Sequence, residues 1–318
     1  MSKVNINTKL SFVFYVKYMV LFITSGLLLA SSVSCQKELK LKYDTDAIKQ
    51  VIISNFTPNN YLSVNISKSK TPDDFSSVEF LNNCTVQLYE DGIFKENMLF
   101  VLKDTLSGLG SYKSSFKLKE NKTYKIISTH PTLGITSAEE YLPTLSNSLV
   151  VTLLDHADTS QPSKTGKYNI TFQDEPSIQN YYTTAAYYKV LTPVIDSFGD
   201  TSYKTNFIYN IPSYTPEIPN TINYGRSYFP DITFNGQLKS YLFSFQSTYN
   251  NIYKEIYLVV EFANVGPSYF EWYYQQLPKS DQTFNDGQNE RINFSTNVVN
   301  GYGHFSGFSA ISRTIRIK

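Results

Sequence analysis

Few side chains in this sequence have the types and spacing of catalytic or metal-binding groups. The three histidines, His130, His156 and His304, lie far apart, and none stands in a metal-ligand spacing such as His-Glu-x-x-His. Asp155 and Asp158 flank His156, a set able to chelate a metal ion, but this set begins a loop rich in Ser, Thr and Pro. The sequence therefore predicts no metal site and no cofactor.

Paired carboxylates suited to acid–base catalysis are not indicated either. Glu139 and Glu140 are neighbours, as are Asp73 and Asp74, and neighbouring residues on a strand point to opposite faces. Residues 285–290 carry oxygen ligands at a loosely calcium-like spacing but lack the order of an EF-hand loop, so we expect a solvated turn. Because no Gly-x-Ser-x-Gly sequence and no phosphate-binding loop is present, we expect a non-enzymatic protein.

A glycine-rich segment near the C-terminus, Gly301-Tyr-Gly-His-Phe-Ser-Gly307, has the composition of a phosphate cradle. It lacks the lysine and the following helix that give such a loop its anion site. Its flanks have the pattern of strands, so we expect the glycines to permit a bulge or a tight turn. The segment is therefore predicted to be structural.

Cys35 has the clearest chemical assignment in the chain. It directly follows residues 21–34, a short apolar run that ends in small residues, and three lysines but no acidic residue precede that run. This pattern indicates an export signal, and the cysteine indicates a bacterial lipoprotein in which Cys35 carries palmitate and other acyl chains. Ser32 stands where such signals usually have Leu. Residues 1–34 are thus the predicted signal peptide, and 35–46 are a predicted polar tether.

A permanent transmembrane helix and a plain secretory signal are the alternatives. Thr24, Ser25 and Gly26 interrupt the apolar run, which is shorter than the ~20 residues that a membrane span needs, so cleavage is favoured. The other cysteine, Cys84, lies in a strand-like stretch and is expected to be a small buried residue rather than a nucleophile. A disulfide between Cys35 and Cys84 requires that Cys35 is not acylated.

The composition argues against partners that bind through charge. The chain has 28 Lys and Arg against 27 Asp and Glu, so neither a nucleic-acid footprint nor charge-driven binding to anionic lipid is indicated. It has 26 Tyr and 22 Phe but one Trp, a bias typical of strands. Most of these rings fall at alternating positions, which favours aromatic cores; a ligand or partner surface is the alternative interpretation.

The pattern of apolar residues predicts a mainly β fold. Short alternating runs at roughly ten-residue spacing predict an N-terminal immunoglobulin-like β-sandwich over residues 47–143. Tyr61–Ser67 alternates cleanly, and Asp91-Gly92 is a hairpin signal. A boundary at 142–148 precedes a second β-rich domain, 149–318, which contains one short helix.

The helix is predicted from Ser268 to Leu277, with Ser268 and Glu271 forming a capping box. Pro267 as the first helical residue, with Gly266 as the cap, is the alternative. The apolar face of this helix would comprise Phe270, Tyr273, Tyr274 and Leu277.

The stretch 212–236 contains four prolines and is expected to be an irregular loop. Long loops inside compact domains are often functional. Its aromatic side chains are therefore candidate contact residues for a partner, and we single out Tyr214, Tyr224, Tyr228 and Phe229.

Residues 292–307, Ile-Asn-Phe-Ser-Thr-Asn-Val-Val-Asn-Gly-Tyr-Gly-His-Phe-Ser-Gly, resemble the signature of a Bacteroidota lipoprotein family named domain of unknown function 4249. That signature is a strand followed by Asn-x-x-x-Gly-x-Gly-x-Phe. The matching positions are Asn297, Gly301, Gly303 and Phe305. Asn121–Ile127 is similar to the family's Gly-Lys-x-Tyr strand, with Asn121 in place of Gly, and the predicted helix is similar to the one that precedes the signature.

The resemblance implies an outer-membrane lipoprotein that is anchored through Cys35 at the cell surface, with the periplasmic face as the alternative. Members are similar in being encoded beside TonB-dependent outer-membrane transporters. The implied function is a non-enzymatic accessory or ligand-binding partner of such a transporter in nutrient uptake; the ligand is unknown. A structural or adhesive cell-surface protein is the alternative. A hydrolase would instead require a buried carboxylate or histidine with a strongly perturbed pKa in a cleft.

Overall fold

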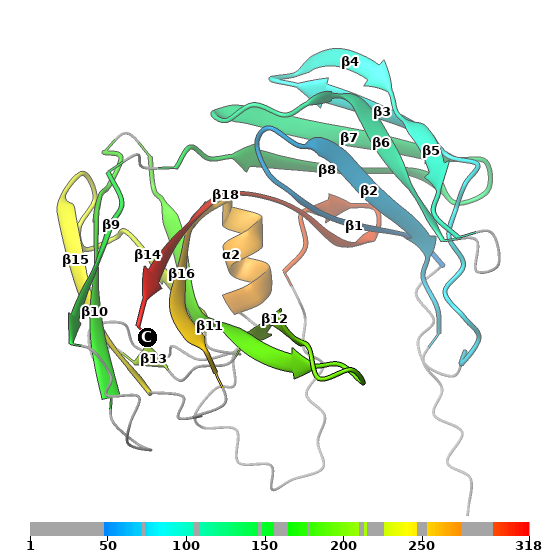
Figure 1. Cartoon of the computed structure of the whole chain (residues 1–318). Helices are drawn as coiled ribbons and strands as arrows, with labels where there is room; N and C mark the ends of the chain where they lie inside the picture. Colours follow the sequence, from blue (N-terminus) through cyan, green and yellow to red (C-terminus); the bar gives the residue numbers. More distant parts are fainter. Residues whose placement is uncertain are drawn as a thin grey trace, which may run out of the picture. The chain divides into compact units, whose positions relative to one another are not determined.

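The computed structural model describes residues 48–71, 74–104, 109–145, 148–155, 165–176, 178–209, 213–214, 226–246, 253–274 and 295–317 (Figure 1). The predicted signal peptide, the tether and Cys35 lie outside these ranges. Residues 47–318 form one compact unit. Within the described ranges, no helix is long and apolar enough to cross a membrane.

The described residues form strands and one helix, α2 (Pro267–Tyr274), which confirms the predicted mainly β class. The largest sheet has the order β12-β11-β16-β18-β1-β2-β6-β5, with β14 beside β11. Its strands are β1 (Gln50–Phe56), β2 (Tyr61–Lys68), β5 (Leu99–Leu102), β6 (Gly110–Lys117), β11 (Tyr181–Ile195), β12 (Thr201–Ile208), β14 (Arg226–Pro230), β16 (Glu255–Val265) and β18 (Tyr302–Arg316).

Two smaller sheets complete the fold. One has the order β17-β8-β7-β3-β4 and the other the order β13-β15-β10-β9. The first is built from β3 (Thr85–Glu90), β4 (Ile93–Asn97), β7 (Lys122–His130), β8 (Gly134–Leu142) and β17 (Val298–Val299). The second is built from β9 (Val150–Asp155), β10 (Thr165–Gln173), β13 (Ser213–Tyr214) and β15 (Leu238–Gln246).

Alternating burial explains the first core. Leu62 and Val64 of β2 are buried, and so are Val86 of β3 and Ile126 of β7. These side chains belong to one cluster, so the β1-β2-β6 part of the large sheet packs on the β8-β7-β3 sheet. The predicted hairpin at Asp91-Gly92 joins β3 to β4 with positive φ at both residues, as a type I′ turn requires.

The second core is largely aromatic, as the composition suggests. Tyr168 of β10 stacks on Phe243 of β15, with ring centroids 5.1 Å apart and planes 10° apart. Phe172 of β10 lies 4.6 Å from Phe262 of β16. These rings belong to one cluster in which β10 and β15 pack on β11 and β16. Many of the Tyr and Phe residues are therefore core residues.

One strand is shared by both cores. Residues 302–307 of β18 pair in parallel with β1, and residues 308–316 pair in antiparallel fashion with β16. The large sheet therefore extends across the predicted boundary at 142–148, which lies between β8 and β9. The C-terminal strand expected from Thr314 is the end of this much longer strand.

Part of the expected loop at 212–236 is a strand. Residues 226–230 form β14, which pairs with residues 181–185 of β11. The prediction of an irregular loop was therefore wrong for residues 226–230. The side chains of Tyr228 and Phe229 are buried, so they are not available as the contact residues proposed for that loop. The four prolines favoured a loop, but the edge of β11 offers backbone partners that the proline-rich pattern does not reveal.

The helix begins at Pro267, as in the alternative interpretation, and the predicted capping box is not formed. The Phe270 amide donates to the Gly266 carbonyl at 3.1 Å. The Glu271 carboxylate instead accepts a hydrogen bond from the Ser295 hydroxyl at 2.7 Å. Tyr269 and Phe270 form the buried side of α2, whereas Tyr274 is exposed.

Candidate functional site

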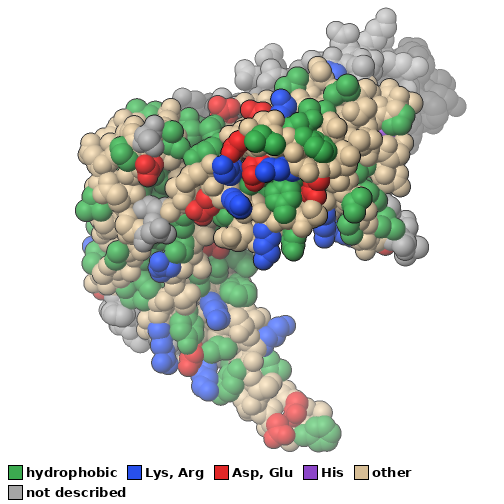
Figure 2. Space-filling model, turned by 90° about the horizontal axis from the view of Figure 1, so that it is seen from above, with side chains coloured by type: hydrophobic (Ala, Val, Ile, Leu, Met, Phe, Trp, Pro, Cys, Tyr) green, Lys and Arg blue, Asp and Glu red, His purple; other side chains and the backbone are tan. Residues whose placement is uncertain are grey.

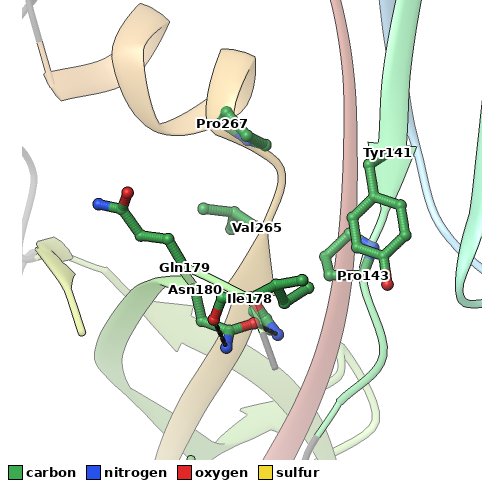
Figure 3. Close-up of a pocket in the computed structure, with 8 residues that line it drawn as sticks. Tyr141, Pro143, Ile178, Gln179, Asn180, Val265 and Pro267 are labelled. Atoms are coloured by element: carbon green, nitrogen blue, oxygen red, sulfur yellow. Dashed lines mark hydrogen bonds between the residues drawn. The ribbon is translucent and has the colours of Figure 1, made fainter. Parts of the chain in front are cut away.

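A pocket of about 280 Å³ lies where the end of β8, the end of β16 and the start of α2 meet (Figure 3). Figure 3 shows Tyr141 and Pro143 on one side and Val265 and Pro267 on the other. The described residues that line it are Tyr141, Pro143, Ile178, Gln179, Asn180, Asn264, Val265 and Pro267. None of these residues is charged, so the pocket offers an apolar surface with carboxamide groups.

Hydrogen bonds fix the two asparagines of this pocket. The Asn264 Nδ2 donates to the Thr144 carbonyl at 2.9 Å and to the Asn180 Oδ1 at 3.1 Å. The Asn180 Nδ2 donates to the carbonyls of Glu175 and Ile178, both at 3.0 Å. These bonds tie the segment after β8 to β16 and to the segment before β11. The walls of the pocket are therefore held in place by buried polar contacts.

One buried acceptor in this network is unsatisfied. The Asn264 side chain is 3 % exposed, and its Oδ1 has no hydrogen-bond partner among the described residues. A buried acceptor without a donor costs roughly 1–3 kcal/mol. The oxygen has almost no accessible surface, so it is sealed inside the network rather than open to the pocket.

Glu140 lies next to the pocket and holds the start of α2. Its Oε2 accepts a hydrogen bond from the Ser268 amide at 2.9 Å, and its Oε1 accepts one from the Tyr141 amide at 2.9 Å. The side chain is buried, and burial raises the pKa of the carboxyl group to about 7. Because both oxygens accept hydrogen bonds from backbone amides, the group acts as a helix cap rather than as a general acid.

Glu139 and Glu140 point to opposite faces of β8, as predicted. The Glu139 side chain is exposed and lies 3.6 Å from the Lys125 ammonium group. Its neighbour Glu140 is buried against α2. The two carboxylates therefore cannot act together on one substrate.

His304 of β18 packs against the aromatic rings of Trp272 and Tyr273 on α2. Its ring centroid lies 4.6 Å from that of Trp272, and its Nε2 lies 3.2 Å from the Asn55 Oδ1. The Asn55 Nδ2 donates to the Tyr273 hydroxyl at 3.1 Å. Burial lowers the pKa of His304 to about 4, so the imidazole is neutral at physiological pH.

The other histidine and cysteine candidates have structural surroundings. The His130 Nδ1 accepts hydrogen bonds from the amides of Thr132 and Leu133, which closes the turn between β7 and β8. Cys84 is half-buried, and burial raises the pKa of its thiol, which disfavours the nucleophilic thiolate. His156 lies outside the described residues. Within the described part of the chain, no cluster of His, Cys, Asp and Glu is arranged to hold a metal ion.

The four motif residues near the C-terminus lie together. The Asn297 Nδ2 donates to the Phe305 carbonyl at 2.7 Å and to the Glu139 carbonyl at 2.9 Å. The Asn297 Oδ1 accepts from the Phe305 amide at 3.0 Å. The Phe305 ring is fully buried and lies 4.6 Å from that of Phe56. Asn297 thus joins β18 to β8 next to the first core.

The two glycines of the motif allow close backbone contact. Gly303 has φ +106°, and a Cβ there would lie 2.0 Å from the Ile52 carbonyl oxygen of β1. A Cβ on Gly301 would lie 2.7 Å from the Gln50 carbonyl oxygen. Both positions therefore admit only glycine without rearrangement.

The structure describes the side chains of two of the four proposed contact residues in the 212–236 stretch. Tyr228 and Phe229 are buried in β14, and Tyr214 belongs to β13, where only its backbone is described. Tyr224 lies outside the described residues. Asn180 and Asn264, which shape the pocket, were not singled out because isolated asparagines carry no recognisable spacing.

A family sequence profile described as Domain of unknown function (DUF4249) matches residues 36–314. The chain belongs to this family. The match to DUF4249 covers both cores, the pocket and the C-terminal motif. Comparison with curated protein sequences finds no match.

Proposed function

We propose that this DUF4249 protein is a Bacteroidota outer-membrane lipoprotein, anchored at the cell surface through acyl chains on Cys35. It acts as a non-enzymatic accessory of a TonB-dependent transporter and binds a ligand during nutrient uptake. The pocket beside α2 carries the ligand-binding part of this proposal. The export signal and the likeness to lipoproteins beside such transporters support the location and the partner.

The chemistry of the pocket indicates a small uncharged ligand. Tyr141, Pro143 and Pro267 offer apolar surface, and the described lining contains carboxamides but no charge. Glu140 lies beside the pocket and has a raised pKa, but both of its oxygens already accept hydrogen bonds from backbone amides. This arrangement favours ligand binding over hydrolysis.

The proposed anchor is tested by mass spectrometry of the mature protein. The N-terminal peptide is expected to begin at Cys35 and to carry acyl chains, because the signal is removed directly before the modified cysteine. A mature N-terminus elsewhere, or an unmodified Cys35, would contradict the anchor. A Cys35→Ala variant is expected to leave the membrane fraction, because alanine has no thiol to carry the acyl chains that bind the protein to the membrane.

A deletion strain separates the accessory function from the adhesive alternative. We expect slower growth on at least one nutrient as the sole source, with surface attachment unchanged. Loss of attachment together with normal growth on every nutrient would support the structural or adhesive function instead. Complementation with the wild-type chain is the control.

A further inference from the structure

β12 forms the end of the largest sheet and has one open edge. It pairs with β11, and no other strand of the described chain pairs with its outer side. The edge is rich in exposed aromatic side chains, with Tyr203 47 %, Phe207 48 % and the adjacent Tyr209 62 % exposed. Exposed apolar edge strands are templates for pairing with another chain.

The hairpin of β11 and β12 also extends beyond the rest of its sheet (Figure 1). β16 accompanies β11 only as far as Leu191, whereas the pairing with β12 continues to Ile195 and Thr201. The resulting arm, residues 192–204, is a two-stranded ribbon with exposed side chains on both faces. Isolated ribbons of two strands are marginally stable, so a third strand beside the arm would stabilise it.

The tip of the arm is ordered and acidic. The Asp196 Oδ1 accepts hydrogen bonds from the amides of Phe198 and Asp200, both at 2.9 Å. Phe198 is 91 % exposed on this turn. The arm forms the extension at the lower end of Figure 2, where red and green side chains mark the tip. Two carboxylates at the tip disfavour insertion into a surface of lipid phosphates.

The sequence of β12 is complementary to itself in the antiparallel register centred on Thr205. With Thr205 opposite Thr205 of a second copy, Tyr203 faces Phe207 of the second copy and Lys204 faces Asn206 of the second copy. Aromatic pairs and threonine pairs across antiparallel strands are stabilising, and no like charges lie opposite each other. Centring the pair on Lys204 would instead place two ammonium groups together. Shifting the pairing by one residue would place the aromatic face of one strand on the same side of the joined sheet as the polar face of the other strand.

We propose that two copies of this chain associate through β12, with Thr205 on the two-fold axis, and join their large sheets into one. The exposed rings of one arm then pack beside the aromatic cluster of the other. In that cluster, the ring of Phe207 lies 5.9 Å from Tyr187 and 6.0 Å from Tyr209. The same surface patch serves both protomers, as a two-fold interface requires. The proposal is independent of the transporter partnership.

Cross-linking at the axis tests the register. A Thr205→Cys variant of the full-length protein, in a Cys84→Ser background, is expected to form a disulfide-linked dimer under mild oxidation. Directly opposite residues of antiparallel strands lie within reach of such a bond. Lys204→Cys is the control, because its partner in the proposed register is Asn206. Equal cross-linking of both variants, or of neither, would overturn the proposed register.

Sedimentation of the detergent-solubilised full-length protein tests the dimer itself. The wild type is expected at twice the protomer mass, and Thr205→Lys should weaken association by roughly fivefold or more, because two ammonium groups then meet at the axis. Thr85→Lys, at an exposed position of β3, is the matched control and should dimerise normally. Circular dichroism checks that the variants fold. A monomeric wild type, or a dimer unaffected by Thr205→Lys, would overturn the proposal and leave the transporter partnership untouched.

Discussion

At the scale of single residues, Glu140 combines a buried location with two hydrogen bonds to backbone amides. Its folded-state pKa of about 7 lies above the ordinary value of 4.5 because burial disfavours the charge. Between these pH values the folded protein retains a proton that the unfolded chain releases. The stabilising contribution of this group is therefore complete below pH 4.5 and is lost as the pH rises through 7.

The first prediction follows from this sign. We compare the free energies of unfolding of the wild type and of Glu140→Gln. The wild-type value minus the variant value should fall by roughly 3 kcal/mol between acidic and mildly alkaline pH. Chemical denaturation at several pH values measures this difference. Glu139→Gln is the control and should show little pH dependence, because the Glu139 side chain is exposed. A flat or rising difference for Glu140→Gln would contradict the assignment.

His304 should have the opposite dependence. Burial lowers its pKa to about 4, so its neutral form is favoured in the folded state and stability falls as the pH drops from 6.5 towards 4. The imidazole proton resonances of His304 in an NMR titration should therefore remain unchanged at pH values where an exposed histidine titrates. Titration of His304 near pH 6.5 would show that the ring is not enclosed by Trp272 and Asn55.

At the scale of elements, the C-terminal motif explains how β18 joins the first core. Asn297 makes three hydrogen bonds to backbone groups of β8 and β18. Asn297→Ala should lower the free energy of unfolding by roughly 2–4 kcal/mol, because each bond contributes about 1 kcal/mol and buried groups lose partners. Asn297→Asp keeps the acceptor for the Phe305 amide but turns a carboxylate oxygen towards the carbonyls of Glu139 and Phe305, so it should also be destabilising. Equal stability of all three proteins in denaturant titrations would argue against this role.

Gly303 provides a second test of the same element. A Cβ there would overlap the Ile52 carbonyl, so Gly303→Ala should cost about 3 kcal/mol or more. Gly134 also has positive φ, but a Cβ there meets nothing within 4 Å. Gly134→Ala should therefore cost only about 1 kcal/mol. Denaturation curves of the two variants measure the difference, and equal losses would mean that backbone strain rather than close contact dominates at Gly303.

Local patterns in the sequence predicted those strands and turns that are determined by neighbouring residues. Alternation located β2, and Asp91-Gly92 located the hairpin between β3 and β4. β12 spans Thr201–Ile208 and follows a turn in which the Asp196 carboxylate accepts a hydrogen bond from the Asp200 amide, a contact that the local pattern did not reveal. The cap of α2 comes from Glu140, which is distant in sequence, so no local pattern around Ser268 could reveal it. The pocket depends on the same long-range contacts.

At the scale of the whole molecule, β18 contributes to both cores and the large sheet extends through them. The two cores should therefore unfold together. Fluorescence of the single Trp272 and far-UV circular dichroism are expected to give coincident denaturation curves, as in a two-state transition. Two separated transitions would show that the parts on either side of residues 142–148 are thermodynamically independent.

The central claim is the proposal that this protein is lipid-anchored and is the binding partner of an outer-membrane transporter. Copurification from solubilised outer membranes, with a C-terminal tag on the full-length chain, tests it most directly. We predict that the wild type brings down a large TonB-dependent β-barrel, and that Cys35→Ala, which lacks the anchor, recovers much less of it. A tagged wild-type protein that is correctly anchored and never retains such a barrel would contradict the account.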